Sequence, residues 1–181
     1  MGSPALRQFA ISPLREPEVE ALTRLARGIW LQHYPGIITV RQIEYMLAQR
    51  YSSQVIIDQL RKGTAWWDKL QVAGILAGFS CVEADGQSLK LDKLYVHPRF
   101  HRQGYGRALF EQAERKALQQ GCERIYLQVN RGNHDSIAMY RHVGFEIEKT
   151  LKVDIGGGFV MDDYVMGKKI RGEGRGARGE V

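Results

Sequence analysis

The chain has 181 residues, enough for one domain with a sizeable core, and apolar and charged residues make up 44% and 25% of it, as in ordinary globular proteins. Its formal net charge is +6, but five basic and two acidic residues fall in 168–181, which therefore carry half of the excess. The remainder is only mildly basic, and an anionic small molecule explains this as well as a nucleic acid does. We expect no nucleic-acid partner.

The cysteines and the apolar segments indicate the setting of the protein. Cys81 and Cys122 fall in segments typical of strands, without the spacing of a metal site or a disulfide framework, so we expect no metal and a reducing, cytoplasmic setting. The N-terminus lacks the pattern of a signal peptide, and the most apolar stretch, 72–82, is too short to span a bilayer, so no membrane association is expected. Residues 1–170 are predicted to form the domain and the glycine-rich residues 171–181 a disordered basic tail.

Three helices are predicted in the first third of the chain. Apolar residues recur at helical spacing over 17–32, and Tyr34-Pro35-Gly36 ends this helix. Thr39 is typical of the first residue of a capping box and begins a second helix. Ser52-Ser53 allows a third helix to begin, which ends at Gly63.

A run of strands follows these helices. Residues 65–72 and 76–83 are predicted to form a hairpin about Ala73-Gly74, and a turn at Asp85-Gly86 leads to a third strand over 89–96. In this third strand the apolar positions advance by three residues, from 91 to 94, instead of by two. A β-bulge there would restore one buried face, and bulges often occur beside functional sites.

The second half of the chain alternates helices with strands. A helix is predicted over 104–120, a strand over 125–129, a short helix over 133–142, and a strand from Phe145 that leads into a hairpin at Gly156-Gly157-Gly158. The predicted fold is therefore mixed α/β, with an N-terminal antiparallel meander joined to a parallel β-α-β unit.

The junction between the third strand and the helix that follows it is rich in glycine and in basic residues. Gly104 and Gly106 let backbone N–H groups approach a ligand closely because neither residue carries a Cβ atom. The start of the helix adds unpaired N–H groups and the positive end of its dipole. With His101, Arg102 and Arg107 nearby, the segment is typical of a pyrophosphate site.

Other interpretations of this loop are weaker. A dinucleotide-binding fold is disfavoured because only two of the three glycines of G-x-G-x-x-G are present and no acidic residue follows on a second parallel strand at the usual offset. A Walker loop is excluded because no Gly-Lys-Ser/Thr occurs. From the loop alone, one alternative is still open, namely that it is a tight strand-to-helix connection that binds no ligand.

A second pattern begins about thirty residues after the glycine loop. The strand at 125–129 is followed by Asn-x-x-Ser-x-x-x-Tyr-x-x-x-Gly-Phe, which starts at Asn133. Together the two patterns resemble the GNAT superfamily of N-acetyltransferases. Its members share Gln/Arg-x-x-Gly-x-Gly/Ala after a strand ending in Leu-x-Val, and Asn-x-x-Ala-x-x-x-Tyr-x-x-x-Gly-Phe on the next strand–helix unit. The resemblance runs over about 76–170.

The resemblance implies acetyl-CoA as the co-substrate and a place for it. The backbone of 94–96 would pair with the pantetheine arm like an added strand, and the loop around Gly104 would wrap the pyrophosphate. Asn133 would hydrogen-bond the pantetheine arm, and Tyr140 would stand near the thioester sulfur. His101 replaces the Gln or Arg of the family, so its own contact with a phosphate is left open. The implied cofactor-binding residues are Leu94, Tyr95, Val96, His101, Arg102, Gln103, Gly104, Tyr105, Gly106, Arg107, Asn133, Ser136 and Tyr140.

The expected reaction is direct attack of a primary amine on the acetyl thioester in a ternary complex. Such an amine, with a pKa of about 10.4, is mostly protonated at neutral pH, so the site must help to deprotonate it. Asp92 on the bulged strand is the candidate base, and Tyr140 is the candidate donor to the departing thiolate, acting chiefly through a hydrogen bond. The alternative interpretations are a half-exposed carboxylate and a core aromatic ring.

Other reactive residues are interpreted as structural. No histidine is placed to activate Cys122 as an acyl carrier, and Trp66-Trp67 is assigned to sheet packing. Glu83, Asp162 and Asp163 fit either the mouth of an acceptor site or a solvated hairpin.

The predicted function is transfer of an acetyl group from acetyl-CoA to an amine-bearing small molecule or peptide. The hairpin over 154–166 and the general layout resemble bacterial small-amine and polyamine acetyltransferases, while 103–109 resembles enzymes that acetylate protein N-termini. A protein N-terminal or lysine acetyltransferase and a non-catalytic acyl-CoA sensor are the alternatives. Association into a homodimer is left open.

Overall fold

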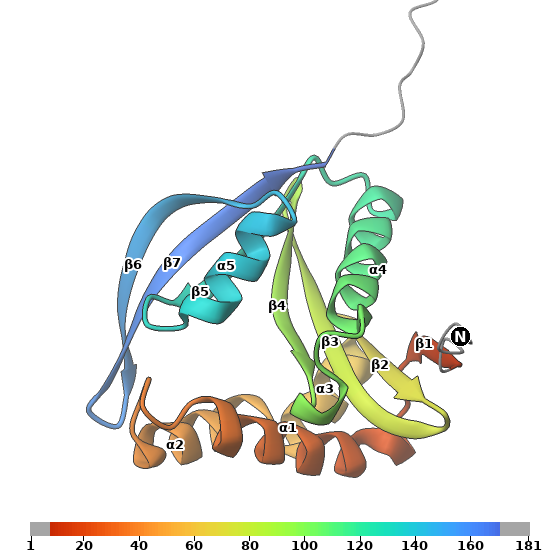
Figure 1. Cartoon of the computed structure of the whole chain (residues 1–181), viewed down its shortest axis with the longest axis horizontal. Coiled ribbons are helices and arrows are strands. Elements are labelled where there is room, and N and C mark those ends of the chain that lie inside the picture. The colour runs from red at the N-terminus through yellow and green to blue at the C-terminus, as the bar shows by residue number, and fades with distance from the viewer. Residues whose placement is uncertain (1–7, 171–181) are drawn as a thin grey trace, which may run out of the picture.

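The computed structural model describes residues 8–170, so the tail expected at 171–181 lies outside the described residues (Figure 1). The predicted helices and strands are all present, and one N-terminal strand is added. In chain order the elements are β1 (Phe9–Pro13), the 3-10 helix η1 (Glu16–Glu18), α1 (Val19–His33), α2 (Val40–Arg50), α3 (Ser53–Lys62), β2 (Trp66–Val72), β3 (Ile75–Asp85), β4 (Ser88–Val96), the 3-10 helix η2 (Pro98–Phe100), α4 (Tyr105–Gln119), β5 (Arg124–Asn130), α5 (His134–His142), β6 (Glu146–Gly156) and β7 (Phe159–Lys169).

Local side-chain bonds fix the ends of the N-terminal helices as predicted. The Thr39 hydroxyl accepts a hydrogen bond from the backbone N–H of Gln42 at 3.2 Å, which caps α2. The hydroxyl of Ser52 accepts from the N–H of Val55 at 3.4 Å and caps α3 in the same way. Gly63 ends α3 with a φ of 62°, a left-handed conformation that glycine adopts without steric cost.

The seven strands form one mixed sheet in the order β1-β2-β3-β4-β5-β7-β6. All neighbouring pairs are antiparallel except β4 and β5, which run parallel because α4 supplies the crossover between them. Only the pairs Ser88–Arg124, Leu89–Ile125 and Lys90–Tyr126 join these two strands. Beyond these pairs the strands diverge, as Figure 1 shows, and α1 lies across the open end.

The predicted bulge in β4 is confirmed. Cys81 of β3 lies opposite Lys93 and the next residue, Val82, lies opposite Leu91, so Asp92 is the extra residue. Neighbouring side chains of a regular strand point to opposite faces, but the bulge breaks this alternation. Both Asp92 and Lys93 consequently contact residues of α2 and its C-cap.

The core lies on both faces of the sheet. Helices α1–α3 cover one face, where Leu22, Ile43 and Ile56 are fully buried. Helices α4 and α5 cover the other face, where Leu109 and Phe145 are buried. Within residues 8–170, no helix has both the length and the apolar character needed to cross a membrane.

Candidate active site

A cavity of about 670 Å³ lies where β4 and β5 diverge. Its walls come from α1, α2, β4, the loop before α4, β5, α5 and β7. This volume falls within the range of about 300–1,000 Å³ that is usual for small-molecule and cofactor sites. The sequence-predicted site residues that line it are Asp92, Leu94, Tyr95, Val96, His101, Arg102, Gly104, Tyr105, Gly106, Asn133, Ser136 and Tyr140.

Two predicted cofactor residues do not line the cavity. The Gln103 amide points to the carbonyl of Arg99 at 3.4 Å. Arg107 is exposed and forms an ion pair with Glu111, with Nε 3.0 Å from Oε1. These side chains therefore belong to the outer surface of the loop and of α4.

The glycine loop has the backbone of an anion cradle. Arg102 and Gly104 adopt positive φ angles of 58° and 83°, and left-handed residues of this kind are typical of loops whose backbone N–H groups bind an anion. Gly104 then begins α4 without a side-chain cap, so the first N–H groups of the helix stay available. No heavy atom lies within 4 Å of a Cβ built at Gly104 or Gly106, so there is open space beside the backbone. These features fit the pyrophosphate of acetyl-CoA.

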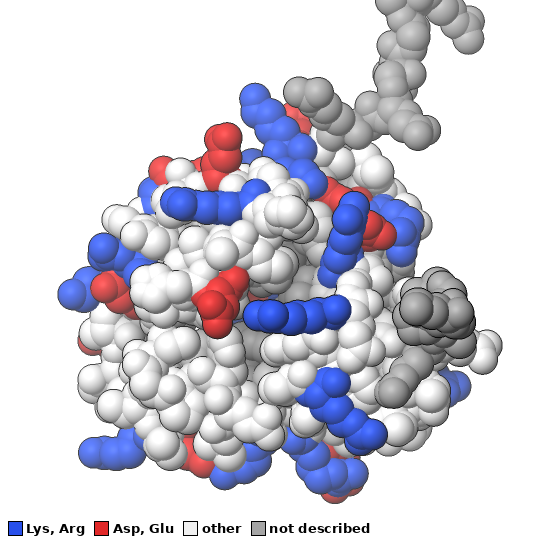
Figure 2. All heavy atoms as spheres, in the orientation of Figure 1, with Lys and Arg blue, Asp and Glu red and all other residues white. Residues whose placement is uncertain are grey.

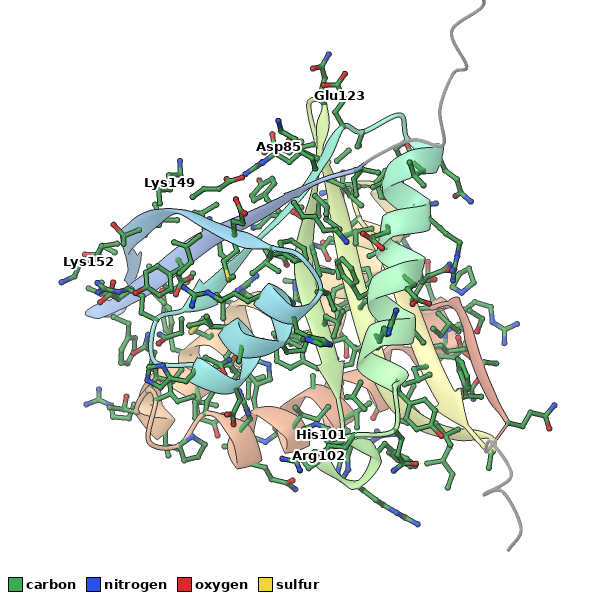
Figure 3. The ribbon with its side chains drawn as sticks, turned by 45° about the horizontal axis from the view of Figure 1, so that its top comes forward. Asp85, His101, Arg102, Glu123, Lys149 and Lys152 are labelled. Atoms are coloured by element: carbon green, nitrogen blue, oxygen red, sulfur yellow. The ribbon has the colours of Figure 1, made fainter. Side chains whose placement is uncertain are left out.

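His101 braces this loop against the end of β4. Its ring nitrogen Nε2 lies 2.7 Å from the carbonyl oxygen of Val96, and Figure 3 shows His101 and Arg102 side by side in the loop. The imidazole is thereby tied to the strand end. The loop therefore offers a ligand its backbone N–H groups and Arg102 more readily than the ring of His101.

Asn133 links the two sides of the cavity. Its Oδ1 atom accepts a hydrogen bond from the N–H of Ser136 at 3.4 Å, which caps α5. The same oxygen lies 3.2 Å from Nε2 of His33, the last residue of α1, and Asn133 is buried. The sequence patterns did not predict this contact with α1.

Three aromatic residues join the α1 region to β4 at the wall of the cavity. The rings of Trp30 and Tyr34, both from the α1 region, have centroids 4.4 Å apart. The hydroxyl groups of Tyr34 and Tyr95 lie 2.8 Å apart and form a hydrogen bond between α1 and β4. All three residues line the cavity.

Tyr140 of α5 is buried and lines the cavity, and its ring packs edge-on against Phe145 with centroids 5.7 Å apart. Among the described residues its hydroxyl has no hydrogen-bond partner. Burial raises the pKa of Tyr140 to about 12. A phenol of this pKa is a poor proton donor to a thiolate, so a hydrogen bond to developing charge is the role that the site favours.

The surroundings of Asp92 disfavour the predicted role of base. Its side chain is only 6% exposed and is shared by three cations: Arg50 at 2.8 Å, Lys90 at 2.9 Å, and Lys93. Burial alone would raise the pKa of Asp92, but these cations outweigh it and hold the pKa well below its usual range. A carboxylate stabilised in this way accepts a proton poorly, and its structural role is to neutralise a buried cationic cluster.

Sequence reasoning missed Arg50 in this cluster. The residue ends α2 and follows Ile43, Met46 and Leu47 on the apolar stripe that packs on the sheet. A charged residue in phase with such a stripe must find a buried partner, and this was the available signal.

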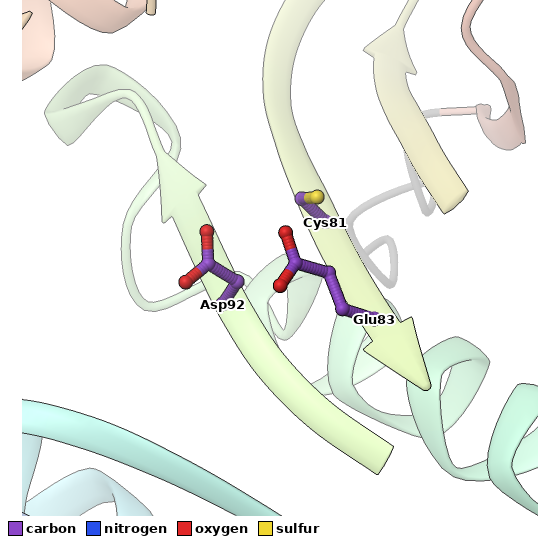
Figure 4. A group of neighbouring side chains, drawn as sticks. All are labelled: Cys81, Glu83 and Asp92. Carbon is purple, nitrogen blue, oxygen red and sulfur yellow. The ribbon is translucent and has the colours of Figure 1, made fainter. Parts of the chain in front are cut away.

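Cys81, Glu83 and Asp92 place potential metal-ligand atoms within 4.8 Å of one another, on neighbouring strands β3 and β4 (Figure 4). We assign no metal to them. A metal ion would have to replace the cations that already bind Asp92, and burial raises the pKa of the Cys81 thiol far above neutrality.

Two neighbouring acidic residues of the C-terminal hairpin have different environments in the structure. Asp162 is half exposed and its Oδ1 atom lies 3.4 Å from Nη1 of Arg131. Asp163 is 4% exposed and lines the cavity. Of these two hairpin carboxylates, only Asp163 could meet a ligand in the cavity. On the outer face shown in Figure 2, acidic and basic side chains are interspersed.

A model of the acetyltransferase (GNAT) family matches residues 26–145, which include most of the cavity. The chain therefore belongs to the GNAT family of acetyltransferases. With the glycine loop and the strand–helix unit of Asn133 and Tyr140 at one cavity, it is an acetyl-CoA-dependent N-acetyltransferase.

Relatives and solved structures agree with this assignment. Spermidine N(1)-acetyltransferase of Thermoplasma acidophilum is 26% identical over 144 residues, which cover 77% of this chain and 89% of that protein. A crystal structure of the PaiA N-acetyltransferase of T. acidophilum with coenzyme A has a TM-score of 0.78 at 24% identity, covering 90% of this chain and 99% of that chain. The ribosomal-protein-S18-alanine N-acetyltransferase of Escherichia coli has a TM-score of 0.66 at 21% identity, covering 93% and 98%. At these identities the two structures are similar to this chain in fold.

Proposed function

We propose that the protein transfers the acetyl group of acetyl-CoA to a primary amine, carried by a small polyamine-like molecule or by a peptide, through direct attack in a ternary complex. The main support is that one continuous cavity has a side suited to acetyl-CoA and a side left for an acceptor. The glycine loop, β4 and α5 supply the side suited to acetyl-CoA, and α1, α2 and β7 supply the side left for an acceptor. The names of the T. acidophilum and E. coli relatives include one enzyme of each acceptor class.

In this proposal the acetyl-CoA binds along β4 and the glycine loop. The backbone of 94–96 pairs with the pantetheine arm, Gly104 and Gly106 leave room for the pyrophosphate, and Asn133 bonds the arm. The lone pair of the amine attacks the thioester carbon, the carbon–sulfur bond breaks, and its electrons go to sulfur. Tyr140 then stabilises the sulfur charge through its hydroxyl.

Direct attack is favoured over an acyl-cysteine route. Cys81 and Cys122 are both buried, and neither lines the cavity. Burial also raises the pKa of each thiol, so little of either is thiolate at neutral pH. Neither cysteine is therefore placed to carry the acetyl group.

Release of free CoA from acetyl-CoA, with hydrolysis subtracted, tests the proposal. We would supply aliphatic monoamines, spermidine, amino-acid amides and short peptides in separate reactions, and identify each product by mass. Amine-dependent release with intersecting initial-rate patterns is expected for a ternary complex. Parallel patterns would indicate a covalent intermediate, and tight acetyl-CoA binding without turnover on any acceptor would indicate a sensor.

A further inference from the structure

Asp163 is the buried carboxylate of the cavity for which the structure gives no partner. It is 4% exposed and lines the cavity, and its side chain accepts no hydrogen bond from any of the residues 8–170. Its oxygens open onto the cavity, because among residues 8–170 the fully enclosed side-chain polar atoms without a partner are Trp30 Nε1 and the Tyr51 hydroxyl. A carboxylate that is largely buried, yet open to the cavity, is available to a cationic ligand there. The neighbouring Asp162, in contrast, has its ion pair with Arg131 and faces outward.

The scaffold fixes where Asp163 points. Along β7 it follows Met161 by two residues, so both side chains lie on the face of the sheet that α1–α3 cover. Helix α2 holds the hairpin in place, because the Gln42 amide donates to the carbonyl of Val160 at 3.0 Å and the Tyr45 hydroxyl donates to that of Ile155 at 2.8 Å. The carboxylate therefore faces the acceptor side of the cavity without any bond of its own.

Few charged groups act on Asp163, and they come from three elements. Burial raises the pKa of Asp163 to about 6; Arg50 of α2 and Lys90 of β4 oppose the shift, and Asp162 on its own strand adds to it. Arg50 and Lys90 are both bonded to Asp92, which leaves Asp163 without a bonded cation. A carboxylate in this state is ionised at pH 7, yet it accepts a proton more readily than an exposed aspartate.

We propose that Asp163 binds the ammonium group of the acceptor and takes its proton before attack. This inference rests on the proposed function and names the base that Asp92 does not provide. A proton passes from the ammonium nitrogen to a carboxylate oxygen, which frees the nitrogen lone pair to form the new carbon–nitrogen bond. As the carbon–sulfur bond breaks, the second nitrogen proton goes to the thiolate, and Asp163 returns its proton to solvent.

The cations nearby help this transfer. Arg50 and Lys90 lie within electrostatic reach of Asp163, and a positive charge close to the bound ammonium favours its neutral form. The acceptor nitrogen thus meets one anion that can receive its proton and two cations that lower its proton affinity. Because a base must be unprotonated to act, kcat/KM for the amine should fall as the pH falls through about 6.

The test compares Asp163→Asn and Asp163→Glu with Asp162→Asn in the full chain. Asp162→Asn is the matched control, since it removes the adjacent carboxylate on the opposite face of the same strand. For each protein, kcat/KM for an accepted amine is measured from pH 5.5 to 9, and acetyl-CoA affinity is measured by calorimetry.

We expect Asp163→Asn to lower kcat/KM by roughly 100-fold or more and to abolish the acid limb, with acetyl-CoA affinity unchanged within about threefold. Asp163→Glu should keep the acid limb and a part of the rate. Asp162→Asn should keep the wild-type plateau of kcat/KM and an acid limb, shifted to a somewhat lower pH because Asp162 helps to raise the pKa of Asp163. A wild-type rate and acid limb in Asp163→Asn would overturn the inference while leaving the proposed function intact. If Asp163→Asn does not fold, Asp163→Glu decides. Wild-type kcat/KM and an unchanged acid limb in Asp163→Glu would overturn the inference, because a displaced carboxylate should not take the proton with wild-type efficiency. No amine-dependent turnover in wild type would overturn the proposed function, and this inference with it.

Discussion

His33, the last residue of α1, places its Nε2 atom 3.2 Å from Oδ1 of Asn133, the N-cap of α5. The contact joins the helix on the acceptor side of the cavity to the helix on the cofactor side. It also orients a side chain that we expect to bond the pantetheine arm. This amide oxygen therefore connects the two halves of the site, as the bond between the Tyr34 and Tyr95 hydroxyl groups also does.

Replacement of His33 with Ala should weaken acetyl-CoA binding by roughly 2- to 10-fold. One hydrogen bond contributes about 0.5–1.5 kcal/mol, and here the loss frees the Asn133 side chain before it binds. Calorimetry of the variant against wild type, with the exposed His142→Ala as control, measures the effect. Tighter binding in His33→Ala would show instead that the imidazole competes with the cofactor for Asn133.

Gly106→Ala should separate cofactor binding from stability. The Cβ meets no heavy atom within 4 Å in the free protein, and alanine is favoured over glycine in a helix by about 1 kcal/mol, so the melting temperature should hold or rise. Affinity for acetyl-CoA should fall at least about tenfold, because the methyl group takes up space beside the anion cradle. Gly28→Ala in α1 is the matched control: it also meets no atom within 4 Å but lies off the cavity. Equal affinities in the two variants would remove Gly106 from the cofactor site.

Tyr140→Phe should keep the fold and bind acetyl-CoA as wild type does, while kcat falls by roughly 10- to 1000-fold. The hydroxyl has no partner to lose among the described residues, and its bond to sulfur forms only as the thiolate develops. Pre-steady-state CoA release shows whether chemistry limits the rate. With chemistry limiting, an unchanged kcat would mean that Tyr140 serves as a core aromatic ring.

Asp92→Asn should act chiefly on stability. It leaves Arg50, Lys90 and Lys93 without their common anion, and loss of one member of a buried ion pair costs about 3–5 kcal/mol. Because the folded-state pKa is depressed, this stabilisation is present above the unfolded pKa near 3.8 and is lost as the pH falls below it. Urea unfolding at pH 7 measures the cost, and Lys93→Met in the same chain should recover part of it. A stable Asp92→Asn protein that lost its acid limb would return Asp92 to the role of base.

Asp163→Asn should stabilise the protein at high pH even as it removes activity. The folded-state pKa is raised from 3.8 to about 6, so ionisation costs folding free energy that is absent below pH 4 and fully present above about pH 7. We expect a gain of about 1–3 kcal/mol at pH 8 and none at pH 4, measured by urea unfolding. An equal change at both pH values would trace the effect to packing instead of charge.

The sequence predicted those parts of the site whose geometry is local. Gly104 sets its own backbone turn, and Asn133 caps the helix that it begins, so the glycine loop and the Asn–Tyr pattern could be interpreted residue by residue. The bulge at Asp92 was also predictable, because a step of three in a strand leaves few alternatives. Element β1 was missed, since five residues ending in Pro13 give a weak strand pattern.

The sequence alone could not predict which charged side chains form pairs, because the pairing depends on tertiary contacts. Arg50 lies 42 positions before Asp92, and nothing in the local pattern of β4 shows that α2 brings a guanidinium to it. The same holds for Asp163. The alternation of side chains in β7 assigns Asp163 to one face of the sheet. Whether a helix or solvent covers that face depends on tertiary bonds, such as the one from Gln42 to Val160, which are 118 positions apart.

The three pairs that join β4 to β5 have a consequence for how the protein unfolds. Strands β1–β4 and strands β5–β7 each form long antiparallel ladders, whereas within the sheet these two blocks are joined by three residue pairs at one end. The remaining contacts between the blocks are made by side chains of the helices and of the core. Such a sheet can open as two cooperative units, which native-state hydrogen exchange would resolve as separate protection classes. A ligand that bridges both blocks should merge these classes, so acetyl-CoA would act on the cooperativity of the fold as well as on its chemistry.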